Sequence, residues 1–407
     1  MQTQWEHRYA VRTQGMKSSA IRELLKYTSL PGIISFGGGF PAPEVFPIKQ
    51  FRDACDTVLT EMGEQALQYG QTEGYYPLRE LIAKNAAKYG IVVSPQNVLI
   101  TSGSQQALDL FGKVFINRGD RILVESPTYL GALQAWNAYG AQYVTIPSDE
   151  EGMQTQHLEE LIKTNLKFIY VLPNFQNPTG VTLSLERRKQ LIEIANLNGV
   201  PIIEDDPYGQ LRYEGEHLPP VVVLDDEIRS KETPIYSGNV IYTSTFSKIL
   251  APGLRLAWVV APEDVIKKLT QAKQGTDLHT STLNQYVAYH VANSPFMKEH
   301  IQNIRVVYRE RRDTMLKALA DYMPEGTSWT SPKGGLFLWV MLPEGYDTSA
   351  IFPKAIEEKV AYVPGEAFHP NGGGKNTMRL NFSACKPDVI IEGIKRLSRV
   401  LKESLAH

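Results

Sequence analysis

Short apolar runs separated by helical patterns are the feature that most constrains the fold of this 407-residue chain. The runs are rich in β-branched and aromatic residues, and most are continuously apolar, as in strands that are covered on both faces. They occupy residues 98–100, 122–124, 168–171, 201–203, 240–242 and 256–260. Strands that alternate with helices predict an α/β fold with a mostly parallel sheet between layers of helices. Ligands of such sheets bind at the carboxyl ends of the strands.

Helical patterns and their breakers divide the chain further. Apolar residues recur at helical spacing from Ala107 to Phe115, and residues 296–322 indicate one long charged helix. A strand at 336–340 and a glycine-rich loop at 372–374 follow that helix. We expect residues 1–47 to form an N-terminal arm and part of a smaller α+β domain. Residues 48–290 would form the large domain, and 291–407 the bridging helix and the small C-terminal domain.

Composition excludes several classes of function. A hydrophobic fraction of 43% and a charged fraction of 21% are those of an ordinary globular protein. The net charge of -2 and the lack of a basic stripe argue against nucleic-acid binding. The first residues lack the apolar stretch of a signal peptide, and no run is long enough to span a membrane, so we expect a cytoplasmic protein. Neither the two cysteines nor the eight histidines are spaced as metal ligands, so we expect no metal.

Lys248 follows the apolar run at 240–242, with hydroxyl groups on Thr245 and Ser247 before it and Arg255 after it. Desolvation favours the neutral form of a lysine, and a neutral amine attacks carbonyl carbon. Hydroxyls and a guanidinium group suit a small anion. The segment therefore predicts a nucleophilic amine next to an anion site.

Polar residues follow two more of the runs. The segment at 101–106 contains Ser104 and Gln105 and joins a strand to a helix, where free backbone N–H groups bind anions. The plainer interpretation is that Ser104 only caps the helix. Residues 173–180 contain Asn177 and read as a turn, since Asn, Pro and Gly are turn formers. A turn does not explain why amide side chains follow a core strand.

The remaining strand ends carry a carboxylate and two tyrosines. Asp205 and Tyr208 lie three residues apart after the run at 201–203. The three carboxylates at 204–206 are consistent with a metal site or, as is usual for such a segment, with a solvated loop. A third interpretation is one buried carboxylate that pairs with a protonated ring nitrogen. Tyr129 follows the run at 122–124, where its ring would cover a heterocycle or simply pack in the core.

Together, five strand ends offer an anion loop, an aromatic face, an amide, a carboxylate with a tyrosine, and a lysine with hydroxyls and an arginine. This set of groups fits a phosphorylated pyridine aldehyde.

With these segments in view, the chain resembles the fold-type I pyridoxal-phosphate enzymes, specifically the class I/II aminotransferases, whose fold is like that of aspartate aminotransferase. The resemblance rests on Asn-Pro-Thr-Gly at 177–180, the pair Asp205 and Tyr208, and Thr-Phe-Ser-Lys with the later arginine at 245–255. It is strongest to the 2-aminoadipate, kynurenine and aromatic aminotransferase branch. Threonine at 245 stands where serine is more usual, and it keeps the hydroxyl group.

The resemblance implies a role for each matching residue. Lys248 is expected to bond to the aldehyde of pyridoxal 5′-phosphate and later to move the α-proton. Asp205 would pair with the pyridine N–H, while Asn177 and Tyr208 would bind the phenolic oxygen. Tyr129 would stack on the ring. The phosphate would be held by Ser104, Gln105, Thr245, Ser247 and Arg255.

The resemblance also implies how substrate and a second subunit are bound. Arg379 would bind the substrate α-carboxylate, because its planar fork matches two oxygens. Gly39 and Asn177 would lie beside the substrate. Arg22 would meet a distal carboxylate, or else pair with a nearby glutamate on the surface. Tyr69 would reach the phosphate of a neighbouring subunit, so we expect a homodimer with shared active sites.

The expected activity is transfer of an amino group from an L-amino acid to a 2-oxo acid by a ping-pong mechanism. Glutamate and 2-oxoglutarate are the expected shared pair, with 2-aminoadipate or an aromatic amino acid as the other donor. One alternative keeps the cofactor but acts as a lyase, decarboxylase or oxidase. Another is a non-catalytic ligand sensor behind a winged-helix module, for which we expect no room before Met16.

Overall fold

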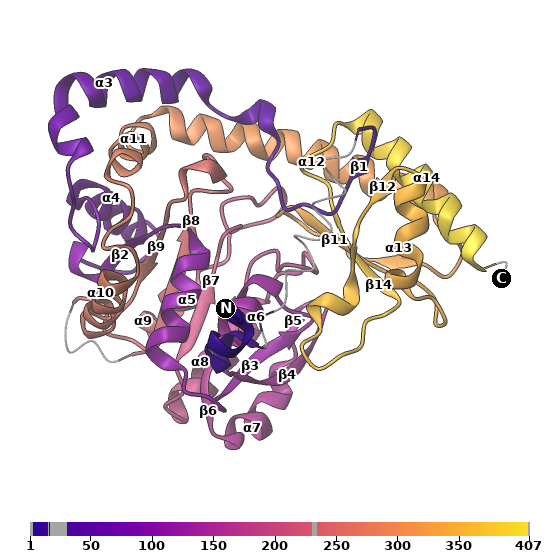
Figure 1. Cartoon of the computed structure of the whole chain (residues 1–407), viewed down its shortest axis with the longest axis horizontal. Helices are drawn as coiled ribbons and strands as arrows, with labels where there is room; N and C mark the ends of the chain where they lie inside the picture. The colour runs from indigo at the N-terminus through magenta and orange to yellow at the C-terminus, as the bar shows by residue number, and fades with distance from the viewer. Residues whose placement is uncertain (1–2, 15, 17–30, 230–233, 406–407) are drawn as a thin grey trace.

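The computed structural model describes residues 3–14, 16, 31–229 and 234–405. Its main layer is an eight-stranded sheet in the order β2-β9-β8-β7-β6-β3-β4-β5 (Figure 1). The strands are β2 (Val98–Thr101), β3 (Arg121–Ser126), β4 (Gln142–Asp149), β5 (Gly152–Met153), β6 (Leu166–Val171), β7 (Ile202–Asp205), β8 (Val240–Thr245) and β9 (Ala257–Val260). All six predicted runs are therefore strands of one sheet.

The direction of the strands gathers their carboxyl ends. Strand β3 pairs in parallel with β4 and β6, and the pairs β6–β7 and β7–β8 are also parallel. Strand β9 is antiparallel to both β8 and β2, so β2 runs in the same direction as β8. The carboxyl ends of β2, β3, β6, β7 and β8 consequently lie at one edge, and the prediction of a mostly parallel α/β sheet is confirmed.

Both faces of the sheet are covered by helices, which explains why the strands are continuously apolar. In β6, Phe168 and Tyr170 pack in one core cluster and Ile169 and Val171 pack in another. The first cluster includes residues of α5 (Ser104–Phe115), α6 (Leu130–Asn137) and α10 (Glu263–Asp277). The second includes residues of α7 (Leu158–Leu161), α8 (Leu185–Leu197) and α9 (Val221–Ile228). Successive residues of a strand thus pack against helices on opposite faces of the sheet.

A smaller α+β part adjoins the sheet through the long helix α12 (Phe296–Tyr322), whose bounds agree with the predicted helix. Its four-stranded sheet has the order β10-β11-β14-β13. The strands are β10 (Ser328–Trp329), β11 (Phe337–Met341), β13 (Val363–Pro364) and β14 (Thr377–Asn381). Helices α13 (Thr348–Glu357) and α14 (Pro387–Leu405) cover this part, and α14 packs along α12.

Residues near the N-terminus also join the smaller part. Strand β1 (Ile34–Ser35) pairs in parallel with β12 (Val360–Ala361). The chain then enters α3 (Ile48–Leu67), which packs against α11 (Thr282–Ala292), and continues into α4 (Tyr76–Ala87). The division of the chain at residues 47 and 290 remains a prediction.

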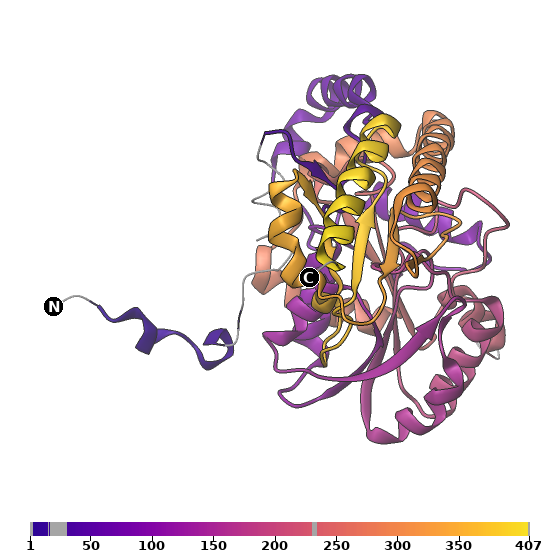
Figure 2. The same ribbon diagram turned by 90° about the vertical axis from the view of Figure 1, so that its right-hand side faces the viewer.

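The first described segment stands apart from the rest. It contains a 3-10 turn at Trp5–Arg8 and the short helix α1 (Val11–Gln14), and it projects away from the body of the molecule (Figure 2). The side chains of Trp5 and Tyr9 are 64% and 59% exposed. Within the described ranges, no helix is long and apolar enough to cross a membrane.

Candidate active site

A cavity of about 330 Å³ lies at the edge where the strands' carboxyl ends meet. Its volume is within the range of small-molecule pockets, which is roughly 300–1,000 Å³. Twelve of the residues singled out in the sequence line it: Gly39, Ser104, Gln105, Tyr129, Asn177, Asp205, Tyr208, Thr245, Ser247, Lys248, Arg255 and Arg379. They come from five strand ends of the large sheet, from the loop after β1 and from β14 of the small sheet.

Lys248 lies three residues beyond β8 and extends its side chain into this cavity. Its Nζ donates a hydrogen bond to the backbone oxygen of Gly39 at 2.8 Å. Burial, together with the positive charges of Arg379 and Arg255, lowers the pKa of Lys248 to about 8. About a tenth of the amine is therefore neutral and nucleophilic at pH 7, far more than for an ordinary lysine.

Asp205 ends β7 and is almost completely buried. Its Oδ2 accepts a hydrogen bond of 2.8 Å from the Tyr170 hydroxyl, whereas its Oδ1 has no partner among the described residues. Burial raises the pKa of Asp205 to about 7; the Tyr170 hydrogen bond opposes this rise and the nearby Asp206 adds to it. A buried carboxyl group with a free acceptor atom suits a ligand that brings its own positively charged N–H.

An anion cradle forms where α5 begins. Ser104 is the first residue of this 12-residue helix, and Gly103 before it has a φ of 84°, which favours glycine. A Cβ atom at Gly103 would collide with the guanidinium group of Arg255. The loop after β8 contributes the Ser247 hydroxyl as a further donor. This hydroxyl itself accepts a hydrogen bond of 2.9 Å from Thr245 Oγ1. Helix N–H groups, hydroxyls and a guanidinium fit a phosphate group.

Arg379 faces the cavity from β14 and is held on several sides. It donates from Nη1 to Asn177 Oδ1 at 2.8 Å and from Nη2 to the Gly37 oxygen at 2.7 Å. Its guanidinium carbon lies 4.2 Å from the centre of the Phe337 ring and 5.1 Å from that of Phe368. Burial lowers the pKa of Arg379 to about 10, so it stays charged at neutral pH. The Nε atom has no partner in the part of the chain that the structure describes.

Two tyrosines complete the wall of the cavity. Burial raises the pKa of Tyr129 to about 12 and also raises that of Tyr208, so both are neutral phenols at physiological pH. Tyr129 lies at the N-terminus of α6, and Gly131 leaves room for its ring because a Cβ atom there would collide with it. The Tyr208 ring meets Phe337 edge to face at 6.0 Å.

One predicted residue is not brought into this cavity. Tyr69 is 78% exposed and lines a separate hollow with His279, whose ring it meets edge to face at 5.8 Å. The predicted Arg22 lies outside the described residues.

Sequence reasoning missed three residues that support the site. Tyr170 was counted only as part of an apolar run, although its hydroxyl reaches Asp205. Phe337 and Phe368, the aromatic neighbours of Arg379, come from β11 and from a short 3-10 helix at Gly365–Phe368. The only signal for Tyr170 was a polar-tipped aromatic side chain in a buried strand, which normally finds a hydrogen-bond partner.

A nucleophilic lysine, a carboxyl acceptor and an anion cradle around one cavity of an α/β sheet define a protein that binds a phosphorylated pyridine aldehyde. Comparison with known proteins gives the family. The profile of aminotransferase class I and II matches residues 35–397, and the chain belongs to this family.

Individual relatives match almost end to end. The chain is 47% identical to aromatic-amino-acid aminotransferase 1 of Thermococcus litoralis, over 98% of this chain and 95% of the relative. Kynurenine aminotransferase of Pyrococcus horikoshii superposes with a TM-score of 0.93 at 47% identity, covering 99% and 98% of the two chains. Alpha-aminoadipate aminotransferase of Thermus thermophilus, in complex with N-(5′-phosphopyridoxyl)-L-leucine, superposes with 0.92 at 43% identity, covering 99% and 100%.

The protein is therefore an aminotransferase, and its cofactor is pyridoxal 5′-phosphate. The predicted fold, activity and cofactor are confirmed. The residues of the cavity fit this cofactor. Asp205 Oδ1 has no partner among the described residues and suits the ring N–H, and the cradle at Gly103 and Arg255 suits the phosphate. When bound, the cofactor supplies a reactive aldehyde and a protonated ring that withdraws electrons.

Proposed function

We propose that the cavity lined by Lys248, Asp205 and Arg379 is the active site of the aminotransferase. The observation that supports this most directly is the free Oδ1 of the buried Asp205 in the same cavity as a lysine whose pKa is lowered to about 8. A carboxylate that keeps the ring nitrogen protonated and an amine that gains and loses a proton near neutrality are what amino-group transfer requires.

In this proposal each side chain has a separate task. The neutral Lys248 amine would take the proton from the substrate α-carbon and hold it on Nζ, and the bound cofactor would supply the electron-withdrawing ring that makes this proton acidic. The charged Arg379 binds the substrate α-carboxylate, held in place by Asn177 and by its two aromatic neighbours. Tyr208 and Asn177 donate hydrogen bonds to the phenolic oxygen of the cofactor.

The remaining cavity residues bind and orient the cofactor. Ser104, Gln105, Thr245, Ser247 and Arg255 hold its phosphate, and the Tyr129 ring covers one face of the pyridine. The Gly39 carbonyl, which accepts the Lys248 hydrogen bond, lies beside the substrate.

For substrates, we propose glutamate and 2-oxoglutarate as the shared pair and either 2-aminoadipate or an aromatic amino acid as the other donor. The similarity to aromatic, kynurenine and alpha-aminoadipate aminotransferases supports this choice. The role of Arg22 toward a distal carboxylate, and a cytoplasmic location, stay predictions.

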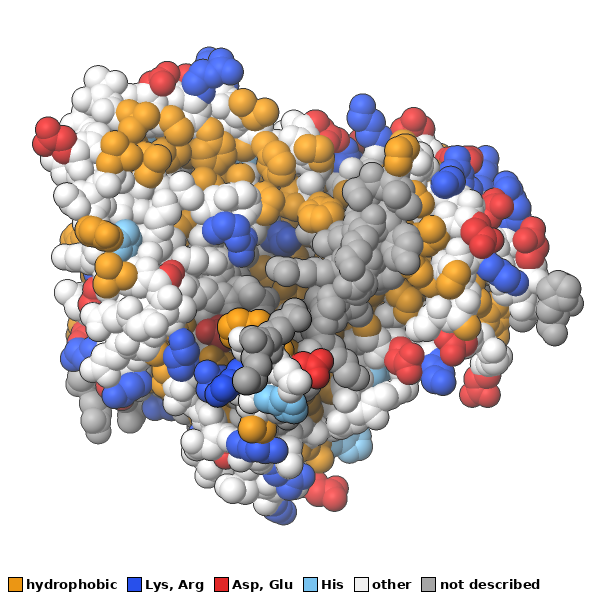
Figure 3. Space-filling view, in the orientation of Figure 1, with side chains coloured by type: hydrophobic (Ala, Val, Ile, Leu, Met, Phe, Trp, Pro, Cys, Tyr) orange, Lys and Arg blue, Asp and Glu red, His pale blue; other side chains and the backbone are white. Residues whose placement is uncertain are grey.

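We further propose a homodimer. Large apolar side chains are exposed along α3 and just after it, among them Leu59, Leu67 and Tyr69, and hydrophobic side chains gather over this region in the space-filling view (Figure 3). Apolar patches of this kind mark protein interfaces. The exposed aromatic arm that holds Trp5 and Tyr9 would pack on the second copy, and Tyr69 would reach the phosphate of the partner's cofactor.

A half-reaction tests the proposed activity. Glutamate added to the holoenzyme without any 2-oxo acid should convert the visible absorption of the pyridoxal form to that of the pyridoxamine form, and 2-oxoglutarate should restore it. Lys248→Ala should bind the cofactor without this conversion. Ammonia or carbon dioxide released without a 2-oxo acid would instead favour a lyase or decarboxylase.

A further inference from the structure

A second cavity adjoins the proposed active site near the carboxyl ends of β7 and β8. It occupies about 150 Å³ between α4, the ends of β7 and β8, and the loop that leads to α9. Asp205 and its neighbour Asp206 separate the two cavities, because consecutive residues of an extended chain point to opposite faces. Asp205 lines the active site and Asp206 lines the second cavity, while Pro207 and Thr245 border both.

The walls of this cavity are mainly apolar and aromatic. Buried side chains that line it include Ile82, Val222, Phe246 and Trp258. On the outer side, Tyr89 is 48% exposed and His217 is exposed, so solvent reaches the cavity from there. Engineered apolar cavities of about 150 Å³ in other proteins bind benzene, which sets the size of molecule that fits.

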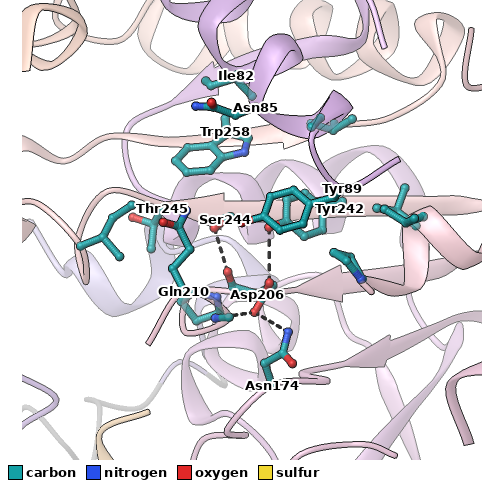
Figure 4. A pocket seen from close by; sticks show the side chains of 18 of the residues that line it. Ile82, Asn85, Tyr89, Asn174, Asp206, Gln210, Tyr242, Ser244, Thr245 and Trp258 are labelled. Atoms are coloured by element: carbon teal, nitrogen blue, oxygen red, sulfur yellow. Dashed lines mark hydrogen bonds between the residues drawn. The ribbon is translucent and has the colours of Figure 1, made fainter. Parts of the chain in front are cut away.

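Asp206 brings a buried carboxylate into these walls. Asp206 Oδ1 accepts hydrogen bonds from Asn174 Nδ2 at 3.0 Å and from the Gly209 backbone N–H at 2.9 Å. The Oδ2 atom has only the Tyr242 hydroxyl, at 3.4 Å, which is longer than an ordinary O–H···O bond of about 2.5–3.0 Å. Figure 4 shows Tyr242 and Asn174 approaching the Asp206 side chain from opposite sides. Oδ2 therefore retains capacity to accept a better hydrogen bond.

The surrounding charges favour a neutral donor over a cation. Asn174, which donates to Asp206, accepts a hydrogen bond of 2.8 Å from the buried guanidinium group of Arg188. A positive charge thus already lies one side chain away from the carboxylate. Moving an ammonium group from water into the apolar walls would add a desolvation cost, which a neutral hydroxyl or N–H group avoids in large part.

We infer that this second cavity, here named the Asp206 cavity, is a binding site for a small neutral ring compound with one hydrogen-bond donor, of the size of phenol. The ring packs between Ile82, Val222 and Trp258, and the donor reaches Asp206 Oδ2. The Asp206 cavity is distinct from the cavity that we propose for the cofactor. The two adjoin at the end of β7, where Asp205 and Asp206 are neighbours.

The test is a calorimetric titration of the holoenzyme with phenol and with toluene, which has nearly the same shape but no donor. One saturable phenol site per chain is expected, with toluene weaker by about tenfold or more, the value of one hydrogen bond to a charged carboxylate. Absence of saturable phenol binding, or equal affinity for the two compounds, would overturn the inference.

Two matched variants test whether phenol binds in the Asp206 cavity. Ala86 lines the Asp206 cavity near the end of α4, and its neighbour Ala87 is exposed and does not line it. Ala86→Phe should weaken phenol binding at least tenfold, whereas Ala87→Phe should leave it unchanged. Phenol that binds equally well to both variants occupies another site, such as the active site, and the inference is then wrong.

A second variant keeps the test decisive if Ala86→Phe does not fold. In Asp206→Asn, the donors from Asn174 and Gly209 orient the amide oxygen into the Oδ1 position and leave an NH₂ group in place of Oδ2. The phenol hydroxyl can then only accept a hydrogen bond from the neutral NH₂ group, so the advantage of phenol over toluene should fall to about fivefold or less, while toluene binds as before. An undiminished advantage would exclude Asp206 as the acceptor.

Discussion

At the scale of single residues, the hydrogen bond between Tyr170 and Asp205 controls how acidic the buried carboxyl group is. It lowers the pKa of Asp205 against the larger rise that burial causes. The bond fixes Oδ2, so that Oδ1 is the atom left for a ligand. If Asp205 binds the cofactor as proposed, Tyr170 is a positioning residue, since it would act on the cofactor only through Asp205.

Tyr170→Phe should therefore raise the pKa of Asp205, because the ionised carboxylate loses a donor. A hydrogen bond to a charged group contributes about 1.5–3 kcal/mol, which corresponds to a shift of roughly one pH unit or more. If Asp205 must be ionised to act, the acid limb of the kcat profile should move to higher pH by that amount, and the cofactor should dissociate more readily. Both are measured on the holoenzyme, by initial rates and by absorbance titration.

The chain offers a matched control for this change. Tyr236 also donates a 2.8 Å hydrogen bond to a buried carboxylate, Asp225, away from the cavity. Tyr236→Phe should lower the melting temperature without moving the pH profile. If the two variants shift the acid limb equally, the Tyr170 bond has a structural role only.

At the scale of elements, the start of α5 carries the anion cradle. Gly103→Ala would bring a Cβ atom into the guanidinium group of Arg255 and would strain a backbone with φ of 84°. We expect the dissociation constant of pyridoxal 5′-phosphate to rise by about tenfold or more, through loss of roughly 1.4 kcal/mol or more of binding free energy. Equilibrium dialysis of the apoprotein measures this directly.

Gly119→Ala is a control that separates the effect of backbone strain from that of a collision with Arg255. Gly119 has a similar φ of 92°, and a Cβ atom there would meet nothing within 4 Å. It should lower stability by about 1 kcal/mol without weakening cofactor binding. Weaker cofactor binding in both variants would point to a general loss of stability instead of a specific cradle.

The strands also show how much of the structure could be predicted from the sequence. The continuously apolar strands were predicted because residues such as Phe168 and Ile169 must satisfy two opposite cores. Strand β4 was missed because its buried and exposed residues alternate, so it forms no apolar run. Most residues that line the cavity were predicted from their positions just after the strands, because parallel strands place their carboxyl ends at one edge of the sheet. The partners of Arg379 and the Asp206 cavity depend on packing between segments far apart in sequence, which no local pattern encodes.

At the scale of the whole molecule, the exposed apolar residues of α3 predict a second subunit. Leu67 is the last residue of α3 and is 71% exposed, and Leu197 is the last residue of α8 and is 79% exposed. Leu67→Glu should raise the dimer dissociation constant by about tenfold or more, since burying an unpaired charge is costly. Leu197→Glu should leave it unchanged. Light scattering across a dilution series measures both, and equal effects would argue against an interface at α3.

Tyr69 is exposed and lies outside the cavity of its own chain, a position that the proposed sharing of active sites between subunits would explain. If Tyr69 serves the partner's cofactor, Tyr69→Ala and Lys248→Ala should each be nearly inactive alone. After the two variants are mixed and allowed to exchange subunits, each mixed dimer contains one site with both residues intact and one with neither. Random exchange makes half of the dimers mixed, so roughly a quarter of the wild-type activity should return. If Tyr69 acts within its own chain, no site in the mixture is intact and activity stays absent, although light scattering of differently tagged chains shows that exchange took place.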